Sequence, residues 1–167
     1  MRKRVSHIFA CVVAAVTTQA VMAHGGHDER VKIKMADGRL VFETHISARL
    51  LKPFDQDGDG NLSTAEFRNK APEIKKWVGS HVAVSVLGGG VLKPSFFDTP
   101  ISEGDVSNPD GKVKFVRIIQ HYEHDPEKDL GIRVSLFEDE AKSVLFFKDG
   151  KIFRKNFPAG IIKMALK

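Results

Sequence analysis

Apolar and polar residues alternate along most of this chain, which is the pattern of half-buried β-strands. The alternation covers residues 31–35 and 40–44, and the turn Ala36-Asp37-Gly38 between them predicts a β-hairpin. A second hairpin is predicted where residues 144–147 and 152–153 flank Lys148-Asp149-Gly150. Further strands are predicted at residues 81–86, 92–97, 113–119 and 132–136. Pro94 confines the strand at 92–97 to an edge or a bulge.

A helical period interrupts this alternation in the first half of the chain. Ile46, Leu50 and Phe54 recur at i, i+4 and i+8, which predicts one face of a short helix. Phe67 begins the apolar face of a second helix, and Ala71-Pro72 predicts that this helix kinks or restarts, with Ile74, Trp77 and Val78 inward. The predicted fold class is therefore α+β: a mainly antiparallel β-sandwich over residues 31–167, with a helical insertion at about 45–80.

The first 23 residues have the features of a secretory signal peptide. Arg2, Lys3 and Arg4 precede an apolar run over residues 8–16, and Val21-Met22-Ala23 supplies small residues for cleavage after Ala23. The run is too short for a membrane span, and no later stretch is long enough. We therefore expect a periplasmic or secreted protein with a flexible, glycine-rich leader at residues 24–30.

Composition excludes several classes of function. Cys11 is the only cysteine and lies in the predicted signal peptide, so the processed chain has no thiolate site, disulfide or cysteine nucleophile. Of the 26 basic residues three lie in the signal peptide, so the processed balance against 21 acidic residues is 23 − 21 = +2. The basic residues are scattered, which argues against nucleic-acid binding. No catalytic motif is present, so the sequence predicts a binding protein and no enzyme.

The segment between the two predicted helices carries the chemistry. Residues 55–66 read D-Q-D-G-D-G-N-L-S-T-A-E and match the calcium-loop pattern D-x-[DN]-x-[DN]-G-x5-E. Ca²⁺ takes six to eight oxygen ligands, and Gly60 permits the sharp turn that brings them together. The predicted ligands are Asp55, Asp57, Asp59, the backbone carbonyl of Asn61, Ser63 directly or through water, and both carboxylate oxygens of Glu66.

The residues around this loop also fit an EF-hand. Ser63 and Glu66 form a capping-box pattern at the start of the exiting helix. EF-hands usually pair, but the nearest second candidate, residues 105–115, contains Pro109 and lacks a closing acid. The backbone of Leu62 must therefore bond with a strand edge, a second copy of the protein or solvent. An unpaired loop is expected to bind calcium weakly, on the order of 10⁻⁴ to 10⁻³ M.

The order of these parts resembles a known family. A signal peptide, a strand running into the 54–60 segment F-D-Q-D-G-D-G, a helix through Trp77 and later strands rich in Val and Phe resemble the extracytoplasmic N-terminal domain of the hydrogenase and urease accessory permeases. The membrane region that follows this domain in that family has no counterpart up to Lys167. The resemblance implies calcium binding and export, with a protein or a membrane permease as partner; it does not imply transport.

Four histidines provide an alternative metal chemistry. If His24 becomes the N-terminus, its amine and imidazole can chelate copper or nickel, and His27 can add a nitrogen. His121 and His124 form H-x-x-H, but at the end of a predicted strand they are expected to be solvated loop residues. The sequence therefore leaves two functions open: an exported calcium-binding module, or a periplasmic transition-metal carrier with structural calcium.

Overall fold

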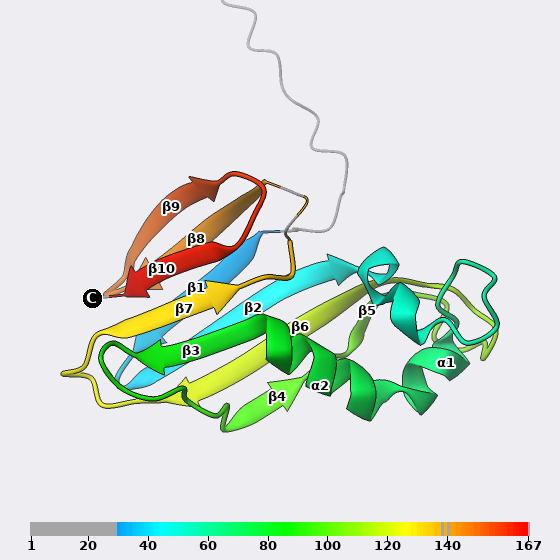
Figure 1. Cartoon of the computed structure of the whole chain (residues 1–167), viewed down its shortest axis with the longest axis horizontal. Coiled ribbons are helices and arrows are strands. Elements are labelled where there is room, and N and C mark those ends of the chain that lie inside the picture. The colour runs from blue at the N-terminus through cyan, green and yellow to red at the C-terminus, as the bar shows by residue number, and fades with distance from the viewer. Residues whose placement is uncertain (1–29, 138, 140, 167) are drawn as a thin grey trace, which may run out of the picture.

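Ten strands form two sheets in the computed structural model, which describes residues 30–137, 139 and 141–166. The larger sheet has the order β4-β6-β2-β1-β8-β9, with β5 also paired to β6, and the smaller has the order β10-β7-β3. Figure 1 shows the smaller sheet in front of one face of the larger one, with the helices toward one end. The strands are β1 Val31–Ala36, β2 Arg39–Ser47, β3 Val82–Val86, β4 Phe96–Asp98, β5 Ile101–Gly104, β6 Val113–Glu123, β7 Leu130–Val134, β8 Lys142–Lys148, β9 Lys151–Phe157 and β10 Ile162–Leu166.

The core lies between the two sheets, as expected for a sandwich. Alternate residues of β2 are buried, and their partners across the antiparallel pair on β6 are buried too, so both strands present one apolar face. The buried residues of β3, β7 and β10 belong to the same hydrophobic cluster. The predicted α+β fold with a mainly antiparallel sandwich is confirmed.

Both predicted hairpins are present, and their turns explain why they form. Asp37 and Gly38 have φ angles of 49° and 73°, and Asp149 and Gly150 have φ angles of 50° and 70°. Positive φ at both central residues matches the twist of the flanking strands, and Asp-Gly tolerates it at low cost. Strands β1–β2 and β8–β9 are therefore specified by local sequence.

Pairings between distant segments differ more from the predictions. β1 pairs with β8 in parallel, and β5 and β10 were not predicted. The strand predicted at 92–97 covers only Phe96–Asp98, since Pro94 cannot donate to a ladder. The strand predicted at 132–136 is β7, Leu130–Val134, and the one predicted at 81–86 begins at Val82 because His81 ends a helix.

The predicted entering helix is present, but the prediction is wrong about its start and its type. Ile46 lies on β2, and the following element is a 3-10 helix, η1 Ala48–Phe54, with an irregular residue at Leu51. Its buried residues Ala48 and Leu51 are three apart, which is the period of a 3-10 helix, and the partly buried Leu50 and Phe54 also pack against the core. Pro53 has no N–H group and disfavours helical geometry in the residue before it, so an α-helix is not favoured here.

The exiting helix has the predicted restart. α1 Thr64–Asn69 ends at Lys70, and α2 Ala71–His81 begins with Pro72 in its first turn. Ile74 and Val78 of α2 are fully buried, and Trp77 packs edge-on against Phe54 with ring centroids 6.3 Å apart. Among the described residues, no helix is long and apolar enough to span a membrane.

Candidate metal centre

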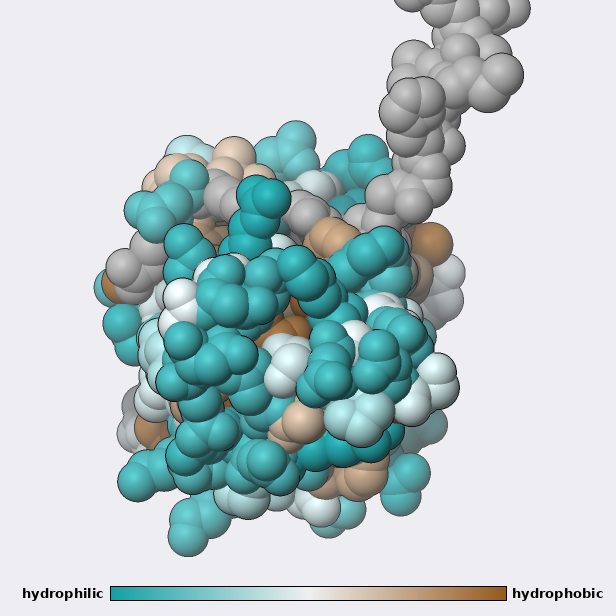
Figure 2. Space-filling view, turned by 90° about the vertical axis from the view of Figure 1, so that its right-hand side faces the viewer, coloured by the Kyte–Doolittle hydropathy of each residue, from teal (hydrophilic) through white to brown (hydrophobic). Residues whose placement is uncertain are grey.

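The segment Asp55–Glu66, here called the acidic loop, joins η1 to α1 at one end of the molecule (Figure 1). Gly58 and Gly60 have φ angles of 74° and 82°, which glycine adopts without the strain that a side chain adds. Figure 2 looks onto this end of the molecule and shows a mainly hydrophilic surface. The loop is therefore open to solvent and to ions.

Three aspartates converge within the acidic loop. One carboxylate oxygen from each of Asp55, Asp57 and Asp59 lies within 4.8 Å of the other two. Asp55 is partly buried, whereas Asp57 and Asp59 are exposed. Three negative groups this close repel one another, so a cation among them removes an unfavourable electrostatic energy.

Backbone hydrogen bonds hold the aspartates in place. The Gly58 and Gly60 amides donate to the two carboxylate oxygens of Asp55, at 2.8 and 2.9 Å. Oδ1 of Asp57 accepts from the Asp59 amide at 3.0 Å, and Oδ1 of Asp59 accepts from the Asn61 amide at 2.7 Å. A carboxylate offers about four lone-pair positions, so each group retains capacity for a cation.

Glu66 closes the loop from the other side. Its Oε1 accepts from the amides of Gln56 at 2.7 Å and Asp57 at 3.3 Å. Its Oε2 accepts from the amide and the hydroxyl of Ser63, at 2.8 and 2.7 Å, while the Glu66 amide donates back to the Ser63 hydroxyl at 3.2 Å. The predicted capping box is therefore confirmed, and one side chain ties the start of the acidic loop to the start of α1.

These hydrogen bonds favour the ionised carboxylate. The Ser63 amide, then the Ser63 hydroxyl and the Gln56 and Asp57 amides, lower the pKa of Glu66 from 4.5 to about 2. The metal-free protein therefore gains stability from Glu66 above pH 4.5, and it loses that gain as the pH falls from 4.5 toward 2.

Replacing Ser63 with alanine in the metal-free protein is expected to raise the pKa of Glu66 from about 2 toward 4.5. The hydroxyl donor is lost, although the backbone donors remain. Carboxyl chemical shifts followed by NMR across acidic pH measure this change. Ser107→Ala is the matched control, because the Ser107 hydroxyl lowers the pKa of Asp105 and does not contact Glu66. An unchanged Glu66 pKa in Ser63→Ala contradicts the assigned cause.

A second segment, Asp105–Lys112, braces the acidic loop and is called the supporting loop. The Val113 amide donates to the Leu62 carbonyl at 2.9 Å, and Ser63 forms an antiparallel bridge with Lys112. Four further bonds join the supporting loop to α1: Thr64 N–H to the Gly111 carbonyl (2.8 Å), Ala65 N–H to the Pro109 carbonyl (2.9 Å), Thr64 Oγ1 to the Asp105 carbonyl (3.1 Å) and Arg68 Nη2 to the Val106 carbonyl (2.9 Å). Of the three partners considered for Leu62, the chain uses its own strand edge.

Basic side chains surround a cavity beside the acidic loop. The cavity has a volume of about 520 Å³, and Asp55, Gly60 and Asn61 form part of its wall. Phe115 and Phe137 also line it, and its basic lining residues are His45, Arg49, Lys52, Lys112, Lys114 and Lys142. The arginine and lysine charges offset part of the negative potential of the loop carboxylates.

The predicted ligands do not all lie in one cluster. The structure gathers Asp55, Asp57 and Asp59 into one group, and it places Ser63 and Glu66 in a hydrogen-bonded pair outside that 4.8 Å group. Asn61 lies at the end of the aspartate turn, where its backbone amide and its side chain both donate to Asp59.

The histidines do not form a comparable cluster in the described part of the chain. His24 and His27 lie outside the described residues. β6 continues through Glu123, so His121 is a strand residue and not the loop residue that was expected; its ring centroid lies 4.9 Å from that of Phe96. His124 contacts the Asp125 carbonyl through Nδ1 at 2.9 Å. The group of potential metal ligands found among the described residues contains only the three aspartates.

Sequence reasoning missed the supporting loop as part of the site. Its segment N-P-D-G, residues 108–111, has the composition of a turn, but nothing in that pattern identifies the segment against which the turn packs. A comparison with protein-family models gives no match for this chain, and a comparison with curated proteins gives none either. The interpretation of the site therefore depends on its own geometry.

Proposed function

We propose that this chain is an exported calcium-binding module that holds one Ca²⁺ in an EF-hand formed by the acidic loop. The observation that carries the proposal is the convergence of three aspartate carboxylates within 4.8 Å, on a loop whose ends are fixed by Glu66 and the supporting loop. The proposal concerns binding and no catalytic role, because the site offers carboxylates and no paired nucleophile and base.

The donor set fits calcium. Its side chains offer oxygen and neither nitrogen nor sulfur, and oxygen ligands suit hard cations such as Ca²⁺ and Mg²⁺ more than copper or nickel. Glu66 at the last position has two carboxylate oxygens to offer, which favours the larger Ca²⁺. The residues proposed to hold the ion are Asp55, Asp57, Asp59, the Asn61 carbonyl, Ser63 and Glu66.

The ion would supply positive charge among the loop carboxylates, and this charge would stabilise the folded arrangement of the elements that the acidic loop connects. The acidic loop connects η1, whose Leu51 is fully buried, to α1, whose Phe67 is 5% exposed. Relief of carboxylate repulsion therefore stabilises the contacts of both elements with the sandwich core. A change at the loop can in this way alter the surface that a partner protein or a membrane permease meets.

Calorimetric titration of the protein with Ca²⁺, Mg²⁺, Cu²⁺ and Ni²⁺ tests the proposal. We expect one Ca²⁺ site, weaker Mg²⁺ binding, and loss of the Ca²⁺ signal in Asp57→Asn. Asp110→Asn is the matched control, because it removes the same charge from the supporting loop outside the proposed ligands. Tight copper or nickel binding without a calcium signal would overturn the proposal in favour of a histidine-based carrier.

Calcium is also expected to stabilise the fold. Binding to the folded state alone contributes RT ln(1 + [L]/Kd), which is about 2.7 kcal/mol at a hundred times the Kd. For a domain of this size the melting temperature should rise by about 5 to 10 °C. Thermal unfolding followed by circular dichroism, with calcium and with a chelator, measures the shift. If calorimetry shows binding but the melting temperature does not change, the acidic loop is not coupled to the core.

A further inference from the structure

A second cavity, of about 320 Å³, is lined by residues outside both the acidic loop and the supporting loop. It is bounded by α2, by the start of β3, by residues 91–97 and by β6. Val82, Leu92 and Phe97 give it apolar walls. A cavity of this volume is at the small end of the range for small-molecule sites, which are mostly apolar with a few polar groups.

One of those polar groups is a buried amide. Gln120 of β6 is 0% exposed, on a buried face of β2 and β6 that is apolar apart from Gln120 and Thr44. Its Oε1 accepts from the Tyr122 hydroxyl at 3.0 Å, and its Nε2 has no hydrogen-bond partner in the described part of the chain. Rotating the amide exchanges the two atoms but still leaves one of them without a partner. A buried polar atom in this state lowers stability, and a ligand acceptor or donor can satisfy it.

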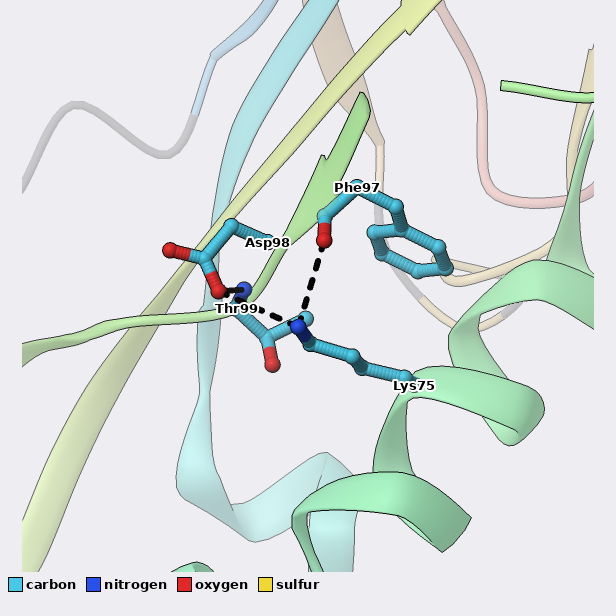
Figure 3. Close-up of polar contacts among 4 residues, drawn as sticks. All are labelled: Lys75, Phe97, Asp98 and Thr99. Carbon is cyan, nitrogen blue, oxygen red and sulfur yellow. Dashed lines mark hydrogen bonds and ion pairs between the residues drawn. The ribbon is translucent and has the colours of Figure 1, made fainter. Parts of the chain in front are cut away.

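Positive charge lies near the same cavity. Lys75, Lys76 and Lys93 line it, and none of its lining residues is acidic. Figure 3 shows Lys75 reaching from α2 to β4, where its Nζ lies 3.2 Å from the Phe97 carbonyl and 3.3 Å from Asp98 Oδ1. Lys76 and Lys93 are exposed and make no ion pair with the residues that the structure describes.

We propose that this cavity binds a small organic carboxylate with an apolar body and a polar group at its far end. The carboxylate lies at Lys76 and Lys93, the apolar body packs on Val82, Leu92 and Phe97, and the polar end reaches the amide of Gln120. The proposal does not depend on calcium, because no proposed calcium ligand lines the cavity.

Three monocyclic probes separate these contributions in NMR titrations of the protein. 4-Hydroxyphenylacetate has the carboxylate, the ring and a polar end; phenylacetate lacks the polar end; tyramine has the ring and the hydroxyl with a positive charge. We expect 4-hydroxyphenylacetate to bind about fivefold more tightly than phenylacetate, the size of one hydrogen bond of about 1 kcal/mol. Tyramine should not bind. Shifts should cluster around Gly79, Leu92 and Gln120.

Double variants test which residues of the protein contact the carboxylate and the polar far end of the probe. Gln120→Leu with Tyr122→Phe removes the buried amide and its hydroxyl partner together, so neither polar group remains alone. In this variant the two carboxylate probes should bind equally. Lys76→Gln with Lys93→Gln should weaken both probes about tenfold, whereas Lys151→Gln with Lys163→Gln, two exposed lysines on β9 and β10, should change neither.

Gly79→Leu separates binding from folding. A Cβ at Gly79 would lie 3.6 Å from the Phe97 ring, an ordinary contact, so the first carbon of a larger side chain fits there. Because Gly79 lines the cavity, we expect the rest of a leucine side chain to occupy part of it. Replacing a helical glycine also favours the helix. We therefore expect an equal or higher melting temperature together with weaker probe binding.

Two results would overturn the proposal: absence of carboxylate binding at millimolar concentration, or equal binding by the wild type and Gly79→Leu. Repeating the titration in Glu66→Gln, where calcium binding is expected to be weakened, keeps a failure of this site distinct from a failure of the calcium site.

Discussion

Calcium binding is expected to weaken at least about tenfold when Glu66 is replaced by glutamine. The substitution exchanges an anion with two equivalent oxygens for a neutral group with one. It also removes one of the two oxygens that accept hydrogen bonds from the Gln56 and Asp57 amides and from the amide and hydroxyl of Ser63. Both the charge opposite the aspartates and the closure of the loop are therefore lost. Calorimetric titration with Ca²⁺ measures the change in Kd.

Glu73→Gln is the matched control for this experiment. It makes the same chemical change one helix later, at an exposed residue that pairs only with Lys70 among the described residues, at 3.4 Å. The control should bind calcium as the wild type does. If Glu66→Gln and wild type have equal affinity, Glu66 is not a calcium ligand and the assignment of the acidic loop fails.

The features that the sequence predicted correctly are those determined within a few residues. Asp37-Gly38 and Asp149-Gly150 each specify a tight turn, so their hairpins follow from local backbone chemistry. The same holds for the capping box and for the three aspartates. Their spacing on a glycine-containing turn is enough to bring them within 4.8 Å of one another.

The features that the sequence did not predict depend on distant partners. Ile46, Leu50 and Phe54 fit an α-helix, whereas Ala48, Leu51 and Phe54 fit a 3-10 helix, and local sequence alone does not choose between them. The choice is made by β6, which pairs with β2 through Ser47 and so keeps Ile46 in a strand. The parallel pairing of β1 with β8 is also a contact between segments far apart in the chain. β10 carries an alternating pattern, but its partner β7 lies about thirty residues away.

The packing of the supporting loop against the acidic loop is also a contact between distant segments of the chain. Among these contacts it bears most directly on calcium binding. In EF-hand proteins the calcium loop usually obtains its partner strand from a second EF-hand. In this chain the supporting loop, together with Val113 of β6, provides backbone partners for Leu62, Thr64 and Ala65. These backbone bonds involve none of the proposed ligand oxygens, so they can order the acidic loop independently of an ion. A site that is ordered in advance loses less entropy on binding, so the supporting loop should raise calcium affinity without supplying a ligand.

Gly111→Ala tests this role. A Cβ at Gly111 would overlap the Asp105 carbonyl oxygen and lie 2.8 Å from the Asp105 Cβ and 2.9 Å from the Asn108 carbonyl oxygen, so backbone atoms would have to move. The turn should open, and the bond from the Thr64 amide to the Gly111 carbonyl should weaken. We expect destabilisation by about 1 to 3 kcal/mol, measured by thermal unfolding. Calcium affinity should fall severalfold by calorimetry.

Two further variants keep this result interpretable. Gly90→Ala makes the same substitution in a glycine turn where an added Cβ meets no atom within 4 Å, so it should change neither stability nor affinity. Thr64→Val is milder than Gly111→Ala, because it removes only the hydroxyl bond to the Asp105 carbonyl at 3.1 Å and keeps the side-chain volume. If the supporting loop orders the site, Thr64→Val should lower calcium affinity in the same direction by a smaller factor while the protein stays folded. Lower stability with unchanged calcium affinity in both Gly111→Ala and Thr64→Val would mean that the hydrogen bonds within Asp55–Glu66 alone hold the site, and the role assigned to the supporting loop would be wrong.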